Sequence, residues 1–213
     1  DLATGVRRRV PVEGNYRAYP AAWSPDGNIL MVGLWAPVQN EPRGARLYSI
    51  EQNTWEEMAD YSGSYMTISP NGRDFVFSNW RTGELFVRPL RGDTTRTLIP
   101  ARGFAASFSP DGRWLAWGGV DGGVAGSPVP PTGAEYPGVG RGQQPLWSPD
   151  GRKIAGAKAH APSESRGPGE SDVYVINVDG SGERNLTDDA VSGGPVWSPD
   201  GQKIAFTSRR DVS

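Results

Sequence analysis

The 213-residue sequence contains no cysteine and a single histidine, His160. These absences exclude disulfide bonds, thiolate chemistry and a zinc site built from histidine and cysteine. A catalytic triad based on histidine would depend on His160 alone. No segment approaches the ~18 continuous apolar residues of a membrane-spanning helix. The charges are balanced, with 22 Lys and Arg against 24 Asp and Glu, which gives no general attraction to nucleic acid or anionic lipid.

The sequence is also poor in long stretches that favour helix, because it holds 29 glycines and 19 prolines. Their combined share is nearly twice the usual ~12 %. Both residues interrupt helices, so the chain is not mostly helical. Eight Trp, seven Tyr and six Phe exclude a typical disordered chain and supply material for a core.

A tetrapeptide occurs five times along the chain, as Ser-Pro-Asp-Gly in four copies and Ser-Pro-Asn-Gly in the second. Proline presets the second position of a type I turn, Asp or Asn suits the third, and glycine suits the fourth. Apolar residues flank each copy, so each predicts a β-hairpin. The copies lie at residues 24–27, 69–72, 109–112, 148–151 and 198–201.

The rest of each period has room for two more strands. Residues 172–176 and 183–187 are expected to form such a pair, with a turn at 179–182 between them. Equivalent pairs are expected at 47–50 with 55–58 and at 85–90 with 95–99. Four short strands every ~40–45 residues are typical of a β-propeller blade. The sequence therefore predicts an all-β propeller of four-stranded antiparallel blades, with about five blades visible.

Two runs carry a resemblance to a known family. They read W-S-P-D-G-x-x-I-A-F at residues 197–206 and D-V-Y-V-I-N-V-D-G-S-G-E-R-N-L-T at 172–187. These runs resemble the WD-like repeats of TolB-type β-propellers, and the repeats cover residues 1–213 as a single propeller domain or propeller fragment. The resemblance implies a fold rather than one activity, because the family includes binding platforms, enzyme-attached propellers and sensor domains. It also points to a periplasmic or extracellular location.

The ends of the chain leave the number of blades open. Residues 6–12 are expected to form an outer strand and residues 203–208 a second strand. Both strands could belong to one fifth blade that closes a five-bladed ring. The favoured alternative is a part of a propeller with six or more blades, because a closing blade without its third strand would leave unpaired edges.

Two segments depart from the repeat, and we expect irregular loops at residues 118–144 and 159–171. Long irregular loops on a rigid scaffold are common binding elements. The equally open alternative is a decorated edge or a contact with missing blades.

The sequence predicts no catalytic residues. It contains no Gly-x-Ser-x-Gly nucleophile elbow, so any attached peptidase domain would lie outside this chain. The acidic residues of the five turns recur once per blade and are expected to stabilise the turns. Asn177, Asp179 and Ser181 follow the spacing of a calcium loop, but a plain hairpin turn is the favoured interpretation, and no other cofactor is expected.

One set of variable residues precedes or begins the first strand of each blade, the strand that lines the central channel in propellers. Several are arginines, which bind carboxylate or phosphate groups through two hydrogen bonds, and several are aromatic, which adds stacking. We therefore expect a ligand site at one mouth of the channel. The alternative is a solvated loop in which the arginines pair with acids at the blade edges. The candidate residues are Arg17, Tyr19, Tyr65, Arg102, Phe104, Arg141 and Gln143.

These observations favour a non-catalytic scaffold that binds a protein, a peptide or a small polar ligand, such as an anionic one, at the channel mouth. Two alternatives stay open. One is the propeller portion of a larger enzyme, such as a prolyl-oligopeptidase-like serine peptidase. The other is a carbohydrate-binding or carbohydrate-active propeller. A nucleic-acid partner and a membrane span are not expected.

Overall fold

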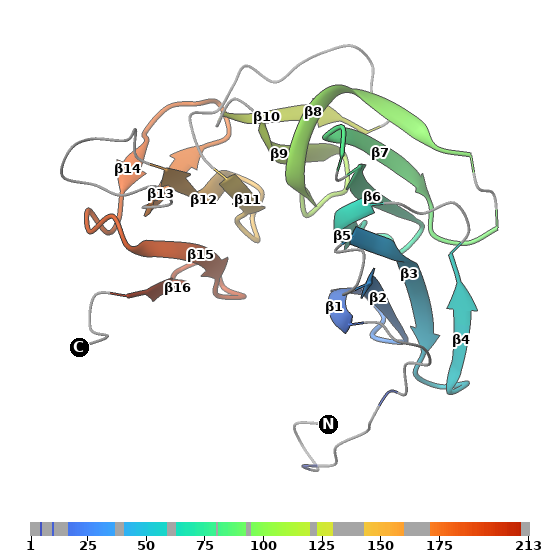
Figure 1. Cartoon of the computed structure of the whole chain (residues 1–213). Helices are drawn as coiled ribbons and strands as arrows, with labels where there is room; N and C mark the ends of the chain where they lie inside the picture. Colours follow the sequence, from blue (N-terminus) through green and yellow to red (C-terminus); the bar gives the residue numbers. More distant parts are fainter. Residues whose placement is uncertain are drawn as a thin grey trace.

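A computed structural model describes residues 5, 10, 17–36, 41–58, 63–79, 81–92, 95–119, 123–129, 143–159 and 171–209. These residues form strands and no helix, and every strand pairing between neighbours is antiparallel. The sheets follow one another in chain order around an arc (Figure 1), and β15 and β16 lie at one end of the arc and β1 at the other. The predicted all-β propeller architecture is confirmed.

Each blade starts with the strand nearest the inside of the arc and continues outward (Figure 1). The first blade contains β1 (Arg17–Trp23), β2 (Ile29–Ala36), β3 (Glu41–Ser49) and β4 (Thr54–Glu57). The second contains β5 (Gly63–Ile68), β6 (Asp74–Asn79), β7 (Glu84–Pro89) and the start of β8 (Thr97–Phe108). The third contains the end of β8, β9 (Trp114–Gly119) and β10 (Val124–Pro128). The fourth contains β11 (Gln143–Trp147), β12 (Lys153–Ala159), β13 (Ser171–Asn177) and β14 (Arg184–Asn185), and the fifth contains β15 (Ser192–Trp197) and β16 (Ile204–Ser208).

The second and third blades share one strand, which the repeat pattern did not predict. The first residues of β8 pair with β7 at the outer edge of the second blade. The last residues of the same strand pair with β9 as the inner strand of the third blade. The two blades therefore form one continuous six-stranded sheet.

Some predicted boundaries differ from the structure. The range 118–144, expected to be irregular, contains β10 and the adjoining ends of β9 and β11. Of the range 159–171, only Ala159 and Ser171 are described, and both lie in strands. The strand expected at 183–187 is reduced to the two residues of β14. The strand expected at 6–12 lies outside the described residues except for Val10.

The five predicted turns share one hydrogen-bond pattern. The serine Oγ donates to the Asp or Asn Oδ1 at 2.5–2.7 Å and accepts the main-chain N–H five residues after the serine at 2.8–3.0 Å. The turn glycine N–H donates to the serine carbonyl. Each glycine has a φ between +68° and +73°, a conformation that other residues rarely adopt. The conformation of each turn therefore depends on its serine, its Asp or Asn, and its glycine.

Consecutive turns pack against one another. A methyl group added to Gly72, Gly112, Gly151 or Gly201 would lie 3.5–3.6 Å from the proline Cδ of the preceding turn. The apolar core follows the same junctions, since Met31 and Leu47 of the first blade pack with Phe75 and Phe77 of the second. Equivalent clusters join the second blade to the third and the third to the fourth. The core is therefore a series of layers between blades.

Four of the five residues that precede the turn serines pack at blade junctions. Ile68 and Phe108 are buried. Trp147 Nε1 donates to Ser107 O at 3.2 Å, and Trp197 Nε1 donates to Leu146 O at 3.1 Å, each across a blade junction. Trp23 differs, because 56 % of its surface is exposed and its blade stands at the end of the arc.

The turn aspartates make stability sensitive to acid. Hydrogen bonds from the serine hydroxyls, and then from main-chain N–H groups, lower the pKa of Asp26, Asp111, Asp150 and Asp200. A carboxyl whose folded pKa lies below its unfolded pKa contributes stability that is complete above the unfolded value, about 4. This contribution is lost as the pH falls through the folded pKa.

We therefore expect the thermal unfolding midpoint, followed by circular dichroism, to fall below about pH 4. The variant Asp111→Asn/Asp150→Asn/Asp200→Asn should lose less stability between pH 7 and pH 3. Asn71 provides the matched precedent, because its Oδ1 accepts the same two hydrogen bonds from the Ser69 hydroxyl and the Arg73 N–H. An acid sensitivity equal to that of the unmodified chain would show that other groups cause it.

Candidate functional site

The inner strand of every blade contains a bulge at an equivalent position. The pairing of the inner strand with the second strand shifts register two or three residues before the residue that precedes the turn. In four blades the residue four positions before the turn serine has a positive φ between +53° and +59°. These residues are Tyr65, Ala105, Gln144 and Gly194. For residues other than glycine this conformation costs about 1 kcal/mol, and such strain is typical of functional segments.

The sequence analysis missed this feature, because the four residues share no chemistry. The one available signal was Gly194, a glycine inside a predicted strand, which often marks a bulge. The first blade has Pro20 at this position, and the proline ring keeps φ negative. Its register shift lies between Pro20 and Ala22.

Two predicted site residues meet across a blade junction. Tyr65 on β5 and Phe104 on β8 pack edge to face, with ring centroids 6.2 Å apart and an interplanar angle of 61°. Tyr65 is 51 % exposed, and Phe104 is partly buried. The pair lies toward the ends of the inner strands that are remote from the Ser-Pro-Asp-Gly turns. It forms an aromatic surface that two blades share.

The two described arginines of the predicted mouth are exposed. Arg102 is opposite Glu84 in register where β8 passes from one blade to the next. It lies two positions before Phe104, the spacing that places side chains on the same face of a strand. Arg17 begins β1 in the neighbouring first blade. Within the described part of the chain, neither guanidinium has an ion-pair partner.

The remaining predicted mouth residues are only partly placed. Tyr19 on β1 pairs with Gly33, and Gln143 on β11 pairs with Ala157. Both stand five residues before a turn serine, as Phe104 does. Arg141 and His160 lie outside the described residues. The structure thus joins Tyr65 to Phe104 and places Arg102 on the same strand as Phe104.

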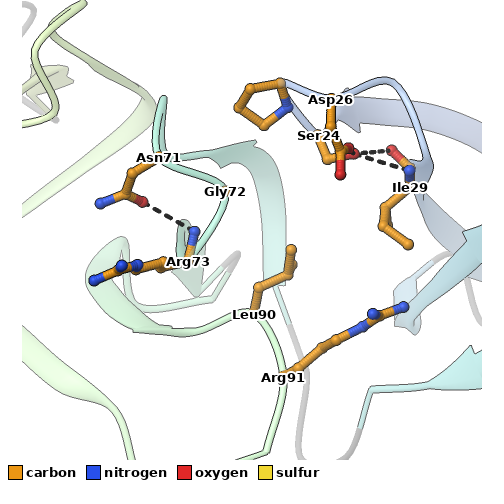
Figure 2. A pocket seen from close by; sticks show the side chains of 9 residues that line it. Ser24, Asp26, Ile29, Asn71, Gly72, Arg73, Leu90 and Arg91 are labelled. Atoms are coloured by element: carbon orange, nitrogen blue, oxygen red, sulfur yellow. Dashed lines mark hydrogen bonds between the residues drawn. The ribbon is translucent and has the colours of Figure 1, made fainter.

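A hollow lies at the turn side of the first blade junction (Figure 2). It measures about 500 Å³ and is bordered by the turns of the first two blades, together with Leu90 and Arg91. The side chains of Arg73 and Arg91 extend in different directions (Figure 2), and Arg91 Nε lies 3.3 Å from Glu56 Oε2. A hollow of about 420 Å³ recurs between the fourth and fifth blades. Because it recurs, we attribute this shape to the blade junctions.

The residues with calcium-loop spacing are engaged with one another. Asp179 Oδ1 accepts hydrogen bonds from the Ser181 N–H at 2.9 Å and the Ser181 hydroxyl at 2.7 Å, which lower the pKa of Asp179. Lys153 Nζ donates to Asn177 Oδ1 at 2.7 Å. No group of three or more His, Asp or Glu side chains suited to a metal occurs among the described residues. The bonds between Asp179 and Ser181 close the turn that follows β13, and the Lys153 bond links β12 to β13.

The buried carboxylate of Asp172 holds neighbouring segments of the fourth blade together. Asp172 is only 2 % exposed and lies on β13 of the fourth blade. Its oxygens accept hydrogen bonds from Asn185 Nδ2, Thr187 Oγ1 and the N–H groups of Asp189 and Ala190, at 2.8–3.2 Å. It thereby fixes the segment that leads to the fifth blade.

Comparisons with solved structures agree with this architecture. No family model matches the chain, and no curated protein matches it. A TolB structure from Agrobacterium tumefaciens is similar with a TM-score of 0.69 and 24 % identity, over 91 % of this chain and 70 % of that one. TolB from Acinetobacter baumannii has a TM-score of 0.66 and 20 % identity, over 89 % and 47 %. Oligogalacturonate lyase from Vibrio parahaemolyticus has a TM-score of 0.63 and 14 % identity, over 91 % and 59 %.

The chain therefore has the fold of a TolB-like β-propeller, and it spans less than half of the Acinetobacter protein. One of the similar propeller structures is an enzyme. Within the described residues, no helix is long and apolar enough to cross a membrane.

The bulge can be tested with two adjacent alanines. Ala105 has a φ of +54°, whereas Ala106 is buried in the core between the second and third blades. We expect Ala105→Gly to leave stability unchanged or raise it by up to about 1 kcal/mol, because glycine removes the strain. Ala106→Gly should lower it by about 1 kcal/mol. Equal losses in urea denaturation would contradict the strained conformation.

The role of Asp172 predicts a different response. Asp172→Asn should lower the unfolding free energy by about 2 kcal/mol, because the amide NH₂ would face groups that now donate to the carboxylate. Asp188→Asn is the matched control, since Asp188 is exposed and Asn tolerates its positive φ. Similar stability of the two variants would show that the four hydrogen bonds contribute little.

Proposed function

We propose that this chain is a non-catalytic propeller scaffold that binds an extended peptide segment at the channel mouth. The observation that carries the proposal is the Tyr65–Phe104 pair, in which an exposed ring from a strained position packs on a ring from the next blade. Single exposed apolar residues are common and need no explanation. A shared aromatic surface that includes a residue in an unfavourable conformation is a stronger indication of binding.

The chemistry of the mouth suits a ligand with both a flat apolar group and a carboxylate. The Tyr65 and Phe104 rings offer a surface for an aromatic or proline side chain. Arg102, two positions before Phe104 and exposed, offers a guanidinium that can donate two parallel hydrogen bonds to a carboxylate. Acidic peptides with aromatic or proline residues satisfy both requirements.

An extended peptide also suits the distribution of the bulges. The bulges recur on inner strands of successive blades, and a rigid scaffold of this kind presents binding groups from several repeats at once. An extended segment can contact several of these positions, whereas a single small ion cannot.

The proposal can be tested by selecting short random peptides displayed on phage against the chain. The strongest peptide is then titrated by isothermal calorimetry. Tyr65→Asn removes the ring but keeps a residue that tolerates positive φ, and Arg102→Gln removes the charge. We expect each variant to weaken binding about tenfold or more. Leu98→Ala is the matched control, because Leu98 is 50 % exposed but pairs on the outer side of the second blade.

Selected peptides that bind both mouth variants as tightly as the unmodified chain would overturn the proposal. An acidic oligosaccharide is the second candidate ligand, because a uronic acid also combines a ring with a carboxylate and one similar propeller is named an oligogalacturonate lyase. Trigalacturonate binding that depends on Tyr65 and Arg102, without peptide binding, would favour this alternative.

A further inference from the structure

The hollow at the first blade junction combines opposite charges with an apolar lining. It measures about 500 Å³, which lies in the range of sites that hold small ligands. Ile29 of the first blade and Leu90 of the second provide its aliphatic lining and are 8 % and 6 % exposed. Asp26 and Arg91, one from each blade, also border it and are exposed. Figure 2 shows the side chains of Ile29 and Leu90 between those of Asp26 and Arg91.

The shape of the hollow belongs to blade junctions in general, but its residue types do not recur. The position of Ile29, five residues after the turn serine, carries an aspartate in the second blade and a tryptophan in the third. The position of Arg91, directly after the residue whose N–H bonds back to its own turn, carries a proline in the third blade and an aspartate in the fourth. These residues are Asp74, Trp114, Pro130 and Asp179. Of the first three junctions, only the first combines an aliphatic residue and an arginine at these positions.

The one turn of the five that lacks a carboxylate also borders this hollow. Asn71 Oδ1 accepts the Ser69 hydroxyl and the Arg73 N–H, as the aspartates do in the other turns, so the turn itself does not require the change. An aspartate at this position would place a negative charge beside Arg91. With Asn71, the lining residues of the second blade carry only positive charge, from Arg73 and Arg91, and those of the first carry only the negative charge of Asp26. The two charges are thus separated across the junction.

Both charged groups keep hydrogen-bonding capacity for a ligand. Asp26 Oδ1 accepts the Ser24 hydroxyl at 2.5 Å and the Asn28 N–H at 3.0 Å, and these bonds lower the pKa of Asp26. Its carboxylate is therefore ionised at neutral pH, with Oδ2 left to accept. Arg91 Nε lies 3.3 Å from Glu56 Oε2 in an exposed pair, and such pairs are weak. Among the ion pairs of the described residues, none joins Asp26 to Arg91.

We propose that this hollow binds a zwitterionic ligand with aliphatic side chains, namely a peptide of about two residues with both ends free. Asp26 accepts the ligand ammonium, Arg91 donates to the ligand carboxylate, and the aliphatic side chains pack on Ile29 and Leu90. A free ion lacks the apolar part, and an internal protein segment lacks the two charged ends. The proposal is independent of the channel mouth, because the hollow lies at the turn ends of the blades.

The dipeptide leucyl-leucine provides the probe, together with its N-acetyl form and its C-terminal amide. Each is titrated into the full chain at about pH 6, where a peptide ammonium is protonated and a peptide carboxylate is ionised. Two-dimensional NMR follows the main-chain amides of Gly72 and Leu90, which border the hollow. We expect saturable shifts with leucyl-leucine. Each capped form should bind about tenfold more weakly, because it loses one charge-assisted hydrogen bond.

Two variants assign each end of the ligand to its partner. Asp26→Asn is compatible with the turn, because Asn71 makes the same two hydrogen bonds in the second blade, and Arg91→Gln removes the guanidinium. Each should weaken leucyl-leucine binding about tenfold. The Asp26 variant should bind the free and acetylated dipeptides equally and still discriminate against the amide. The Arg91 variant should show the reverse. A change in folding alone would not exchange these preferences.

The third turn supplies the matched controls. Asp111→Asn and Arg113→Gln change the same residue types in a turn that does not border this hollow, and both should bind leucyl-leucine as the unmodified chain does. Circular dichroism verifies that each variant keeps the fold. The proposal is overturned if Gly72 and Leu90 show no saturable shift, if the three dipeptide forms bind equally, or if the control variants weaken binding as much as those at Asp26 and Arg91.

Discussion

The hydroxyl of the turn serine is the interaction on which the rest of the structure depends. In every copy it donates to the Asp or Asn side chain and accepts the N–H that begins the second strand. These two bonds fix the register of the inner hairpin. Farther along the inner strand the bulge shifts this register, and Tyr65 and Phe104 lie at the bulges of adjacent blades.

Packing between blades fixes the position of each turn relative to the next one around the arc. The proline of one turn lies against the glycine of the next, and indole N–H groups reach the main chain of the preceding blade. Close approaches within blades matter as well. The ring of Tyr174 would lie 2.8–3.0 Å from a methyl group added to Gly156, so only glycine leaves room for it. Burial raises the pKa of the Tyr174 hydroxyl, which keeps this ring uncharged in the interior.

Sequence reasoning predicted the parts that depend on local chemistry. The five turns were recognisable because proline, Asp or Asn, and glycine each have a defined place in a type I turn, and the number of strands in the first, second and fourth blades followed from the repeat. The continuity of β8 was not predictable, because pairing at its two ends involves different partners. The bulge could not be predicted from the sequence, because Tyr65, Ala105 and Gln144 share a backbone conformation but no side-chain property. Of the predicted mouth, Tyr65 and Phe104 meet across a blade junction, although they occupy different positions in the repeat. Tyr65 stands four residues before its turn serine and Phe104 five.

The shared strand β8 has a consequence for how the molecule opens. The second and third blades form one hydrogen-bonded sheet, so neither can separate from the other without breaking the middle of a continuous strand. Local unfolding follows such cooperative units, and these two blades thus behave as a double unit, whereas the first and fourth blades have sheets of their own. Arg102 and Phe104 lie on β8, the strand that joins the second and third blades. The aromatic surface therefore lies on the part of the arc that is expected to open least by local unfolding. A ligand at the proposed site would meet a preformed surface, so binding would carry little further ordering cost.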